Sequence, residues 1–494
     1  MRRKTDARFA VTAVILIVLT VIFALTLKYK QRQEDPSVQT EQDTQTGDVQ
    51  LDQEQLQEFE NAGESQADQK EEQQPVISME EVEAQRAAFV TDYTSAPLLS
   101  TTPIKYLTMQ QGGQPGEVNF NWFSPSNARG QVVLYNTATG ETRTINASTT
   151  ASATEPGYYY NKAAVTGLQE ETTYSYKVGN AAGWSPVYSF TTENFTGDFT
   201  FLVASDAQIG QSEMEVVQDT IDRWDKVVTR VTSYVPNAAF FAHLGDQVAA
   251  YNDPTHYTGF FEHLGLYTIP MAPVVGNHDV DGWGTGGGPW FYERYNVPNR
   301  STIGCNWADT DGDYWFRYGD VLFMVLNTSS IYGHDVHAEF VEQACAANQD
   351  AKWRIVMGHY SSYSSATKYQ ADSETYRAHY AYLGETYDID LFLSGHDHAY
   401  TRTKFMNGAC EPIEGYDYQS GSTAKNPEGT LFVTLGTASG CTYQPITENY
   451  AAALQSQPMV PTAMKVEVTD TTLKLTTYMV DSWVAFDEYT IQKD

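Results

Sequence analysis

The chain has 494 residues, which is too long for one typical compact core, so two folded domains with additional segments are expected. Its formal net charge of −32 argues against binding to nucleic acid or to an anionic membrane surface through a general basic field. Aromatic residues make up 13% of the chain, which favours β-rich structure over a helical bundle.

The chain begins with the basic stretch MRRKTDAR, followed by the uncharged, mainly apolar residues 9–27. A helix of that length rises about 28 Å, close to the hydrocarbon thickness of a bilayer. Residues 1–30 are therefore expected to be a signal anchor with one transmembrane helix, and a cleaved signal peptide is the alternative. The bases before the segment slightly outweigh those after it, which favours a cytoplasmic N-terminus. The rest of the chain is then expected at the cell membrane, outside the cytoplasm, or secreted if the segment is cleaved.

Residues 31–95 are rich in Gln, Glu, Asp and Ser and contain few large apolar residues. Such a segment buries too little surface to offset its ordering entropy, so we expect a disordered spacer. From 96 to 193 short alternating stretches, among them EVNFNWFSP and TTYSYKV, are separated by turn residues. This pattern predicts a β-sandwich.

Between 197 and 492 apolar strand-like runs alternate with segments of helical spacing. This alternation predicts an α/β domain, whose functional groups gather beyond the carboxyl ends of the strands. Five stretches fit that expectation, because each is an apolar run followed by side chains that bind metals. They carry Asp206 and Gln208, then Asp246, then Asn277 and His278, then His359, and finally His396 and His398.

These residue types suit phosphoester hydrolysis, which needs a strong nucleophile near neutral pH and positive charge beside the phosphoryl oxygens. Two metal ions about 3.5–4 Å apart supply both, with one carboxylate bridging them. Carboxylate, imidazole and amide ligands suit Fe, Mn or Zn, and no thiolate cluster indicates a structural zinc site. We expect His396 and His398 to lie in an extended segment, where residues two apart project to the same side and Asp397 points away.

The motifs D-x-(H/Q), GD, GNH(D/E), GH and GHxH run in order from Asp206 to His398, and this order resembles the calcineurin-like metallophosphoesterase superfamily. The purple acid phosphatase branch is the most similar, since it places a fibronectin type III-like domain ahead of the catalytic domain. GLQEETTYSYKV is similar to the tyrosine-corner region of such domains, and GHDHAYTR to the closing motif of the branch. The resemblance covers about residues 97–490. It implies a four-layer α-β-β-α sandwich at 197–492, preceded by the all-β domain.

The resemblance also implies roles for individual residues. Asp206, Asp246 and His398 would hold metal one, with Gln208 as a nearby oxygen ligand. Asp246 would bridge to metal two, whose remaining ligands would be Asn277, His359 and His396. A metal-bound hydroxide would attack phosphorus. His278 would stabilise the phosphate or protonate the leaving oxygen. Asn277 and His278 are expected to contact the substrate. Tyr360 and Arg402 lie close in sequence to ligands, so they are expected either to contact the substrate as well or to pack around the site.

The resemblance therefore implies an acid phosphatase-like enzyme with two divalent ions, acting on small phosphomonoesters. A phosphodiesterase or nucleotide hydrolase on the same fold, and a catalytically weak surface-binding protein, are the alternatives. Two departures concern the metals. Ala249 occupies the position of the tyrosine ligand of purple acid phosphatases, with Tyr251 two residues too late, so we expect no tyrosinate and no purple colour. Gln208 replaces a common histidine and would be a weaker, neutral ligand.

Three further features are open to two interpretations each. The four cysteines pair as Cys305–Cys345 and Cys410–Cys441 if proximity in sequence decides, or remain buried free thiols. The string GHDVH at 333–337 has helical spacing, which favours surface or substrate-loop histidines over metal ligands. The Gly-rich segment after His278 is either a mobile lid or a plain long connection.

Overall fold

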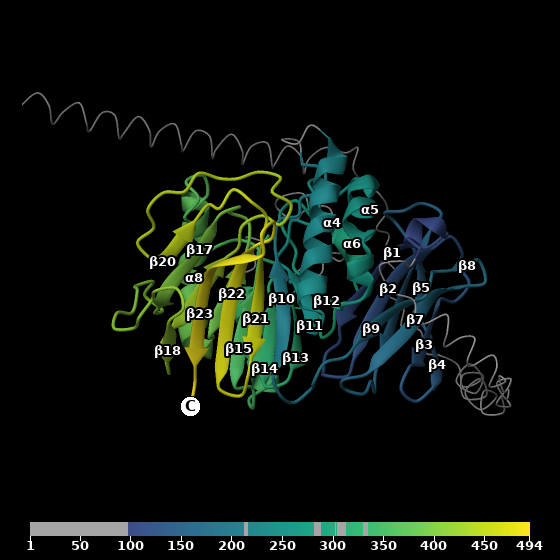
Figure 1. Ribbon diagram of the computed structural model, residues 1–494, viewed down its shortest axis with the longest axis horizontal. Coiled ribbons are helices and arrows are strands. Elements are labelled where there is room, and N and C mark those ends of the chain that lie inside the picture. The colour runs from purple at the N-terminus through teal and green to yellow at the C-terminus, as the bar shows by residue number, and fades with distance from the viewer. Residues whose placement is uncertain (1–96, 212–215, 281–287, 302, 304–312, 330–333) are drawn as a thin grey trace, which may run out of the picture. The chain divides into compact units, whose positions relative to one another are not determined.

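The computed structural model describes residues 97–211, 216–280, 288–301, 303, 313–329 and 334–494 (Figure 1). The expected anchor at 1–30, the expected spacer at 31–95, the Gly-rich segment at 281–287 and Cys305 lie outside the described residues. Within the ranges given above, no helix has both the length and the apolar character needed to cross a membrane.

The first part of the described chain is all-β, as the sequence predicts. A short 3-10 helix, η3 (Leu99–Thr101), precedes nine strands: β1 (Lys105–Gln111), β2 (Val118–Ser124), β3 (Gln131–Asn136), β4 (Thr142–Asn146), β5 (Ser148–Ala151), β6 (Tyr159–Val165), β7 (Thr173–Asn180), β8 (Gly183–Trp184) and β9 (Tyr188–Thr191). β1, β2, β6 and β5 form one face of a sandwich, and β4, β3, β7 and β8, with β9 beside β7, form the other. The core contains Trp122, Phe120 and Tyr176. The hydroxyl of Tyr174 accepts a hydrogen bond from the backbone N–H of Gln169 (2.8 Å), which closes the tyrosine corner.

The second part contains two packed sheets. The first holds β10 (Phe199–Ala204), β11 (Ala238–His243), β12 (Met271–Pro273), β18 (Thr423–Lys425), β21 (Thr462–Val468), β22 (Thr472–Met479) and β23 (Val484–Gln492). The second holds β13 (Tyr314–Tyr318), β14 (Val321–Val325), β15 (Trp353–Met357), β16 (Leu391–Ser394), β17 (Tyr400–Met406), β19 (Thr430–Thr434) and β20 (Ala452–Ser456). The helices are α4 (Val217–Tyr234), α5 (Pro254–Phe261), η4 (Leu264–Tyr267), α6 (Gly288–Tyr292), α7 (His334–Ala347) and α8 (Gln370–Tyr387).

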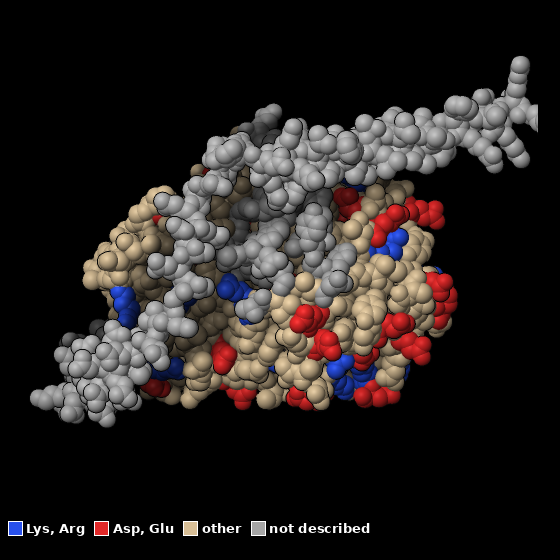
Figure 2. Space-filling model, turned by 180° about the vertical axis from the view of Figure 1, so that it is seen from behind, with Lys and Arg blue, Asp and Glu red and all other residues tan. Residues whose placement is uncertain are grey.

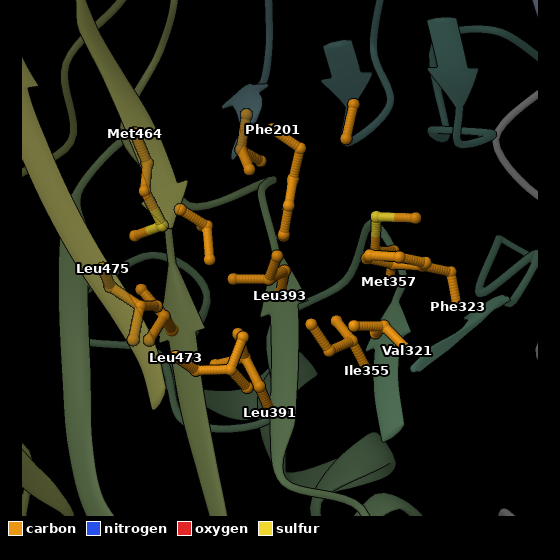
Figure 3. Close-up of a cluster of buried hydrophobic side chains, with 14 of the residues drawn as sticks. Phe201, Val321, Phe323, Ile355, Met357, Leu391, Leu393, Met464, Leu473 and Leu475 are labelled. Atoms are coloured by element: carbon orange, nitrogen blue, oxygen red, sulfur yellow. The ribbon is translucent and has the colours of Figure 1, made fainter. Parts of the chain in front are cut away.

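Three apolar cores separate four layers, which confirms the predicted α-β-β-α order. Phe201 and Met464 of the first sheet meet Phe323 and Leu393 of the second in the central core (Figure 3). Trp224 of α4 packs with α5 on the outer face of the first sheet. Phe340 of α7 and Tyr380 of α8 cover the outer face of the second sheet.

The central strands β10, β11, β14, β15 and β16 are covered on both faces, so they are apolar at nearly every position. In β10, Phe201 and Val203 enter the central core, while Leu202 and Ala204 face the helices. Successive side chains of a strand point to opposite faces, so alternate residues of β10 enter two different cores.

The sandwich and the α/β part share a sheet, which the sequence does not reveal. β1 pairs in parallel with β12, with Gln110 opposite Met271. The sandwich strands β1, β2, β6 and β5 therefore extend the first sheet of the α/β part to eleven strands. Since β12 would otherwise be an edge strand in the described chain, the sandwich completes the pairing of the strand that leads to Asn277.

The proposed cysteine pairing is wrong for the described cysteines, because Cys345, Cys410 and Cys441 are all free thiols. Cys441 is buried beside Gln208 (Sγ to Oε1 3.3 Å), whereas Cys410 lies in the turn after β17, where its carbonyl accepts the Tyr450 hydroxyl. Cys345 contacts Met324 from α7. Proximity in sequence misled because these residues belong to different layers and loops.

Charged side chains are unevenly placed on the face that Figure 2 shows. In the described part of that face, Asp and Glu side chains lie mainly at the right and along the lower edge, with Lys and Arg side chains between them.

Candidate metal centre

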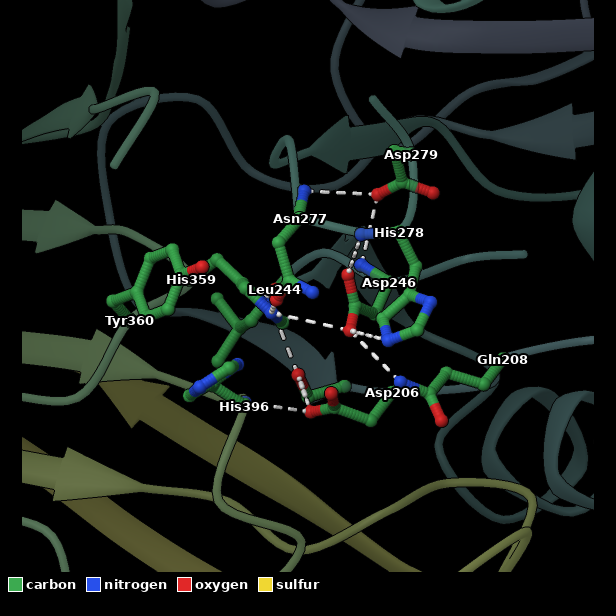
Figure 4. Close-up of polar contacts among 12 residues, drawn as sticks. Asp206, Gln208, Leu244, Asp246, Asn277, His278, Asp279, His359, Tyr360 and His396 are labelled. Atoms are coloured by element: carbon green, nitrogen blue, oxygen red, sulfur yellow. Dashed lines mark hydrogen bonds and ion pairs between the residues drawn. The ribbon is translucent and has the colours of Figure 1, made fainter. Parts of the chain in front are cut away.

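The candidate site lies where the carboxyl ends of parallel strands from both sheets meet. β10, β11 and β12 run parallel in the first sheet, and β15 and β16 in the second. Each of the five predicted stretches follows one of these strands. Figure 4 shows the resulting cluster, with the side chains of Asp206, Asp246, Asn277, His359 and His396 turned toward one another.

Asp246 lies at the centre of the cluster. Its Oδ2 is 3.3 Å from Nε2 of His359 and 4.0 Å from Nε2 of His278. Its Oδ1 accepts the backbone N–H of His278 (2.8 Å). One potential ligand atom from each of Asp246, His359 and His396 lies within 4.8 Å of the other two. This central position is the one that the bridging role requires.

The hydrogen bonds of His359 orient its Nε2 toward the other candidate ligands. Its Nδ1 lies 2.7 Å from the carbonyl oxygen of Leu244, which can only accept, so Nδ1 carries the proton. In the neutral ring Nε2 then presents a lone pair to the Asn277 Oδ1 at 3.1 Å and to the Asp246 carboxylate. Three electron pairs converge there, and a metal ion fits between them.

His398 repeats this arrangement on the other side of the site. Its Nδ1 lies 3.1 Å from the carbonyl oxygen of Thr442, and its Nε2 faces Oδ1 of Asp206 at 3.2 Å. The His396 Nε2 is buried without a hydrogen-bond partner, and the buried Asp206 Oδ1 meets the His398 ring but accepts no other hydrogen bond. Buried polar atoms of this kind are rare unless something binds them. The residues present therefore fit two cations.

The acid–base properties of the ligands point the same way. Burial by itself lowers the pKa of His359, but the Asp246 carboxylate outweighs it and the pKa rises to about 9. Burial also opposes the charged form of His398, yet Asp206 raises its pKa well above the usual value. When His359 and His398 are protonated, their rings supply the positive charge that balances the carboxylates of Asp246 and Asp206. Bound metal ions would supply that charge in place of the protons.

Five of the candidate ligands adopt a backbone conformation that side chains rarely take. Positive φ angles occur at Asp206 (55°), Gln208 (37°), Asp246 (54°), His396 (70°) and His398 (51°). Strain of this kind gathers at functional sites. It also corrects the extended geometry expected for His396 and His398, because both lie in a left-handed turn. Asp397 nevertheless points elsewhere, since it accepts a hydrogen bond from Ser361 Oγ (2.7 Å).

Gln208 differs from the expected oxygen ligand. Its Nε2 donates to Oδ2 of Asp246 (2.9 Å), while its Oε1 accepts from Nε2 of Gln211 (2.8 Å). Gln208 therefore holds the bridging carboxylate as a donor in this arrangement. The glycines of the motifs are required by space, because a Cβ at Gly276 would collide with Asp246 and one at Gly395 with Ser205.

Asp279 is a functional residue that the sequence analysis did not single out. Its carboxylate accepts the backbone N–H groups of Gly276 (2.9 Å), Asp246 (2.8 Å) and Gln247 (2.9 Å). Burial and then Asp246 raise its pKa to about 7. It joins the loop after β11 to the loop after β12, and the last letter of GNHD was the available signal.

The side of the site open to solvent is formed by His278 and two tyrosines. The His278 side chain is 37% exposed, and its Nδ1 lies 2.9 Å from the carbonyl oxygen of Ala249. The rings of Tyr360 and Tyr369 lie 4.3 Å and 4.2 Å from the His396 ring. Tyr369 was not anticipated, because only its distance in space from His396 reveals it.

The structure contradicts a substrate contact by Arg402. The side chain is fully buried, and its Nε and Nη2 bind both oxygens of Asp487 at 2.7 and 3.1 Å. His337 of the GHDVH string is also buried rather than on the surface, and its Nε2 lies 3.5 Å from Asp313. The predicted helical spacing of that string is correct, since α7 begins at His334.

Two family models match adjacent parts of the chain. The model described as the purple acid phosphatase N-terminal domain matches residues 105–192, and the model described as calcineurin-like phosphoesterase matches residues 199–400. Residues 199–400 are therefore similar to the calcineurin-like phosphoesterases, and residues 105–192 to the N-terminal domain of purple acid phosphatases. Members of the purple acid phosphatase group carry a dinuclear metal centre, and the donor set described above fits such a centre.

Individual relatives are distant. The Fe(3+)-Zn(2+) purple acid phosphatase 12 of Arabidopsis thaliana is 24% identical over 281 residues, covering 52% of this chain and 56% of that protein. Acid phosphatase type 7 of Danio rerio is 24% identical over a match that covers 57% of this chain and 65% of that protein. A probable inactive purple acid phosphatase 1 of Arabidopsis thaliana is 23% identical over a match that covers 57% of this chain and 49% of that protein. The chain thus spans about half to two thirds of the length of these relatives.

The fold has a counterpart among solved structures. Purple acid phosphatase PPD1 from yellow lupin (Lupinus luteus) seeds superposes with a TM-score of 0.64 at 18% identity, covering 80% of this chain and 75% of that one. The two proteins therefore share the sandwich-plus-catalytic fold.

Proposed function

We propose that this protein hydrolyses small phosphomonoesters with a dinuclear metal centre. The observation that carries the proposal is the convergence of potential metal-ligand atoms in one buried cluster, from Asp206, Asp246, Asn277, His359, His396 and His398. Two metal ions held there would neutralise the phosphoryl oxygens and lower the pKa of an attacking water.

Side chains of the protein hold the centre together, bind the phosphate or protonate the leaving oxygen, and contact the leaving group. Asp246 holds both halves of the centre together, because it contacts the His359 side and receives Gln208 and His278 from the other. His278 is the exposed imidazole of the site, and its Nε2, 4.0 Å from Asp246 Oδ2, is available to bind the phosphate or to protonate the leaving oxygen. Tyr360 and Tyr369 offer an aromatic wall to the leaving group.

The test is ester hydrolysis by metal-depleted protein after Fe, Mn or Zn is restored. We expect p-nitrophenyl phosphate to be hydrolysed faster than its bis-ester. Asp246→Asn should abolish turnover, and His278→Ala should lower kcat by about 10²–10⁴-fold while metal content stays unchanged. Faster turnover of the bis-ester would favour a phosphodiesterase. No turnover of either ester with any of these metals would refute the enzyme and leave a surface-binding protein.

We also propose that residues 9–27 anchor the protein in the cell membrane, with a spacer at 31–95 and the folded part at 96–193 and 197–492 outside the cytoplasm. The uncharged run between basic flanks supports this proposal. Cell fractionation tests it. The full chain should sediment with membranes and the 1–30 deletion should not, and a full chain found wholly in the soluble fraction would contradict the anchor.

A further inference from the structure

The segment that follows α6 lies between the sandwich and the metal centre. Glu293 binds the sandwich loop through four hydrogen bonds from Ser152, Ala153 and Thr154, at 2.6 to 3.2 Å. The buried guanidinium of Arg294 donates to Thr154 Oγ1 (3.0 Å) and lies over the Tyr106 ring. These contacts fix the segment to the sandwich.

Asn296 is held on the same side. Its backbone N–H donates to Gln110 Oε1 (2.9 Å), and its carbonyl oxygen accepts from Asn119 Nδ2 (2.9 Å). Its Nδ2 donates to the backbone carbonyls of Phe120 (3.4 Å) and Ala163 (3.2 Å), both in sandwich strands. Even the carbonyl of Tyr292 accepts from Lys162 of β6 (2.6 Å).

Tyr295 differs from these neighbours because its side chain reaches the catalytic part. The residue is fully buried, and its hydroxyl donates to Oε1 of Gln247 at 2.7 Å. Gln247 follows Asp246 directly, donates its backbone N–H to Asp279, and its Nε2 donates to the carbonyl of Val274 (3.3 Å). Tyr295 thereby holds the loop of the bridging carboxylate from the side opposite the metal ligands.

The shared sheet supplies a second connection to the same place. β1 of the sandwich pairs with β12, which leads within three residues to the loop of Gly276 and Asn277. That loop and the Asp246 loop are the two that Asp279 joins. The sandwich therefore contacts the support of both loops.

We infer that Tyr295 is a positioning residue for the metal centre, and that residues 293–296 transmit the placement of the sandwich to Asp246. The sandwich then sets metal affinity and is more than a support for the fold. This inference rests on the proposed metal centre, but it concerns metal binding and not ester hydrolysis.

The experiment titrates the metal-depleted full chain with Zn²⁺ or Co²⁺ and measures affinity by calorimetry. Tyr295→Phe should weaken the affinity by about tenfold, the lower end of the effect of outer-shell changes. Glu293→Gln should also weaken the metal affinity. The double variant Tyr295→Phe with Glu293→Gln should lose less binding free energy than the sum of the two single losses, because both residues act through one connection.

Tyr176→Phe is the matched control. It removes a buried tyrosine hydrogen bond of similar length that also joins the sandwich to the α/β part, but this bond reaches the carbonyl of Tyr267 in η4 (2.8 Å) and not the loop of Asp246. Its metal affinity should equal that of the wild type. Unchanged affinity in Tyr295→Phe, an equal loss in Tyr176→Phe, or a Glu293→Gln variant that is less stable but binds metal normally would each overturn the inference. A protein that binds two ions but hydrolyses no ester would instead refute the proposed function.

Discussion

Asp279 offers the sharpest test of how the loops of the metal centre are held. Its Oδ2 accepts the N–H groups of Asp246 and Gly276, and its Oδ1 accepts those of Gln247 (2.9 Å) and Val248 (3.4 Å). Asp279→Asn keeps the shape of the side chain but turns one of the two acceptor atoms into a donor. Two buried N–H groups then face an NH₂ group and lose their partner.

The cost can be worked from these contacts. Leaving a buried donor unsatisfied costs about 1–3 kcal/mol, so two of them lower the free energy of unfolding by about 4 kcal/mol. The same displacement moves Asp246 and the Asn277 loop, and changes in such supporting residues weaken metal binding or activity by about 10–100-fold.

Urea unfolding of the metal-depleted protein measures the first effect, and metal content after dialysis measures the second. Asp390→Asn is the control, because Asp390 is also buried and accepts a backbone N–H, from Arg354 (3.0 Å), but it directly precedes β16, at the end opposite His396. It should lose stability and retain its metals. A loss below about 1 kcal/mol in Asp279→Asn, with normal metal content, would refute the assignment of Asp279 as the tie between the loops.

Three further outcomes are expected. Arg402→Met should lower the free energy of unfolding by about 3–5 kcal/mol, because it leaves the Asp487 carboxylate buried without its partner. The double variant Arg402→Met with Asp487→Leu should recover most of this loss. A raised KM in the double variant would show that Arg402 contacts the substrate after all. Burial raises the pKa of Asp313 from 3.8 to about 7, so the folded state keeps a proton that the unfolded state loses, and stability falls as pH rises through that window. In urea unfolding, the stability of Asp313→Asn minus that of the wild type should therefore be larger at pH ~8 than at pH ~4. A difference that does not change with pH would contradict the burial argument. Protein reconstituted with ferric iron should show no visible tyrosinate band, since Ala249 stands at the ligand position; a band removed by Tyr251→Phe would disprove this.

Much of the fold could be predicted because its signals are local. The period-two pattern around Trp122 and the alternation of strands and helices after residue 197 predict a sandwich followed by a layered α/β domain. The ligand types could be predicted for a similar reason. Buried parallel strands are apolar throughout, so the polar residues that end each run, such as Asp206 and His359, stand out in the sequence.

Predictions failed where the outcome depends on contacts distant in sequence. Arg402 lies four residues from His398, yet its partner is Asp487, and the ion pair removes it from solvent. Cys410 and Cys441 follow each other in the order of the cysteines, but of these two Cys441 is the one that reaches the site. Backbone strain at the ligands is equally hidden, because Asp and His adopt positive φ more often than most residues but the sequence does not show that Asp246 and His398 do so here.

The sequence by itself determined the layers and the chemistry of the donors, because apolar periodicity and residue type are properties of short stretches. Tertiary structure alone decided the pairing of β1 with β12, the place of Asp279 between two loops, and the link from Asn296 through Tyr295 to Gln247. The physical reason is that a hydrogen bond between residues far apart in the chain leaves no local pattern. It forms only when packing brings its donor and acceptor together.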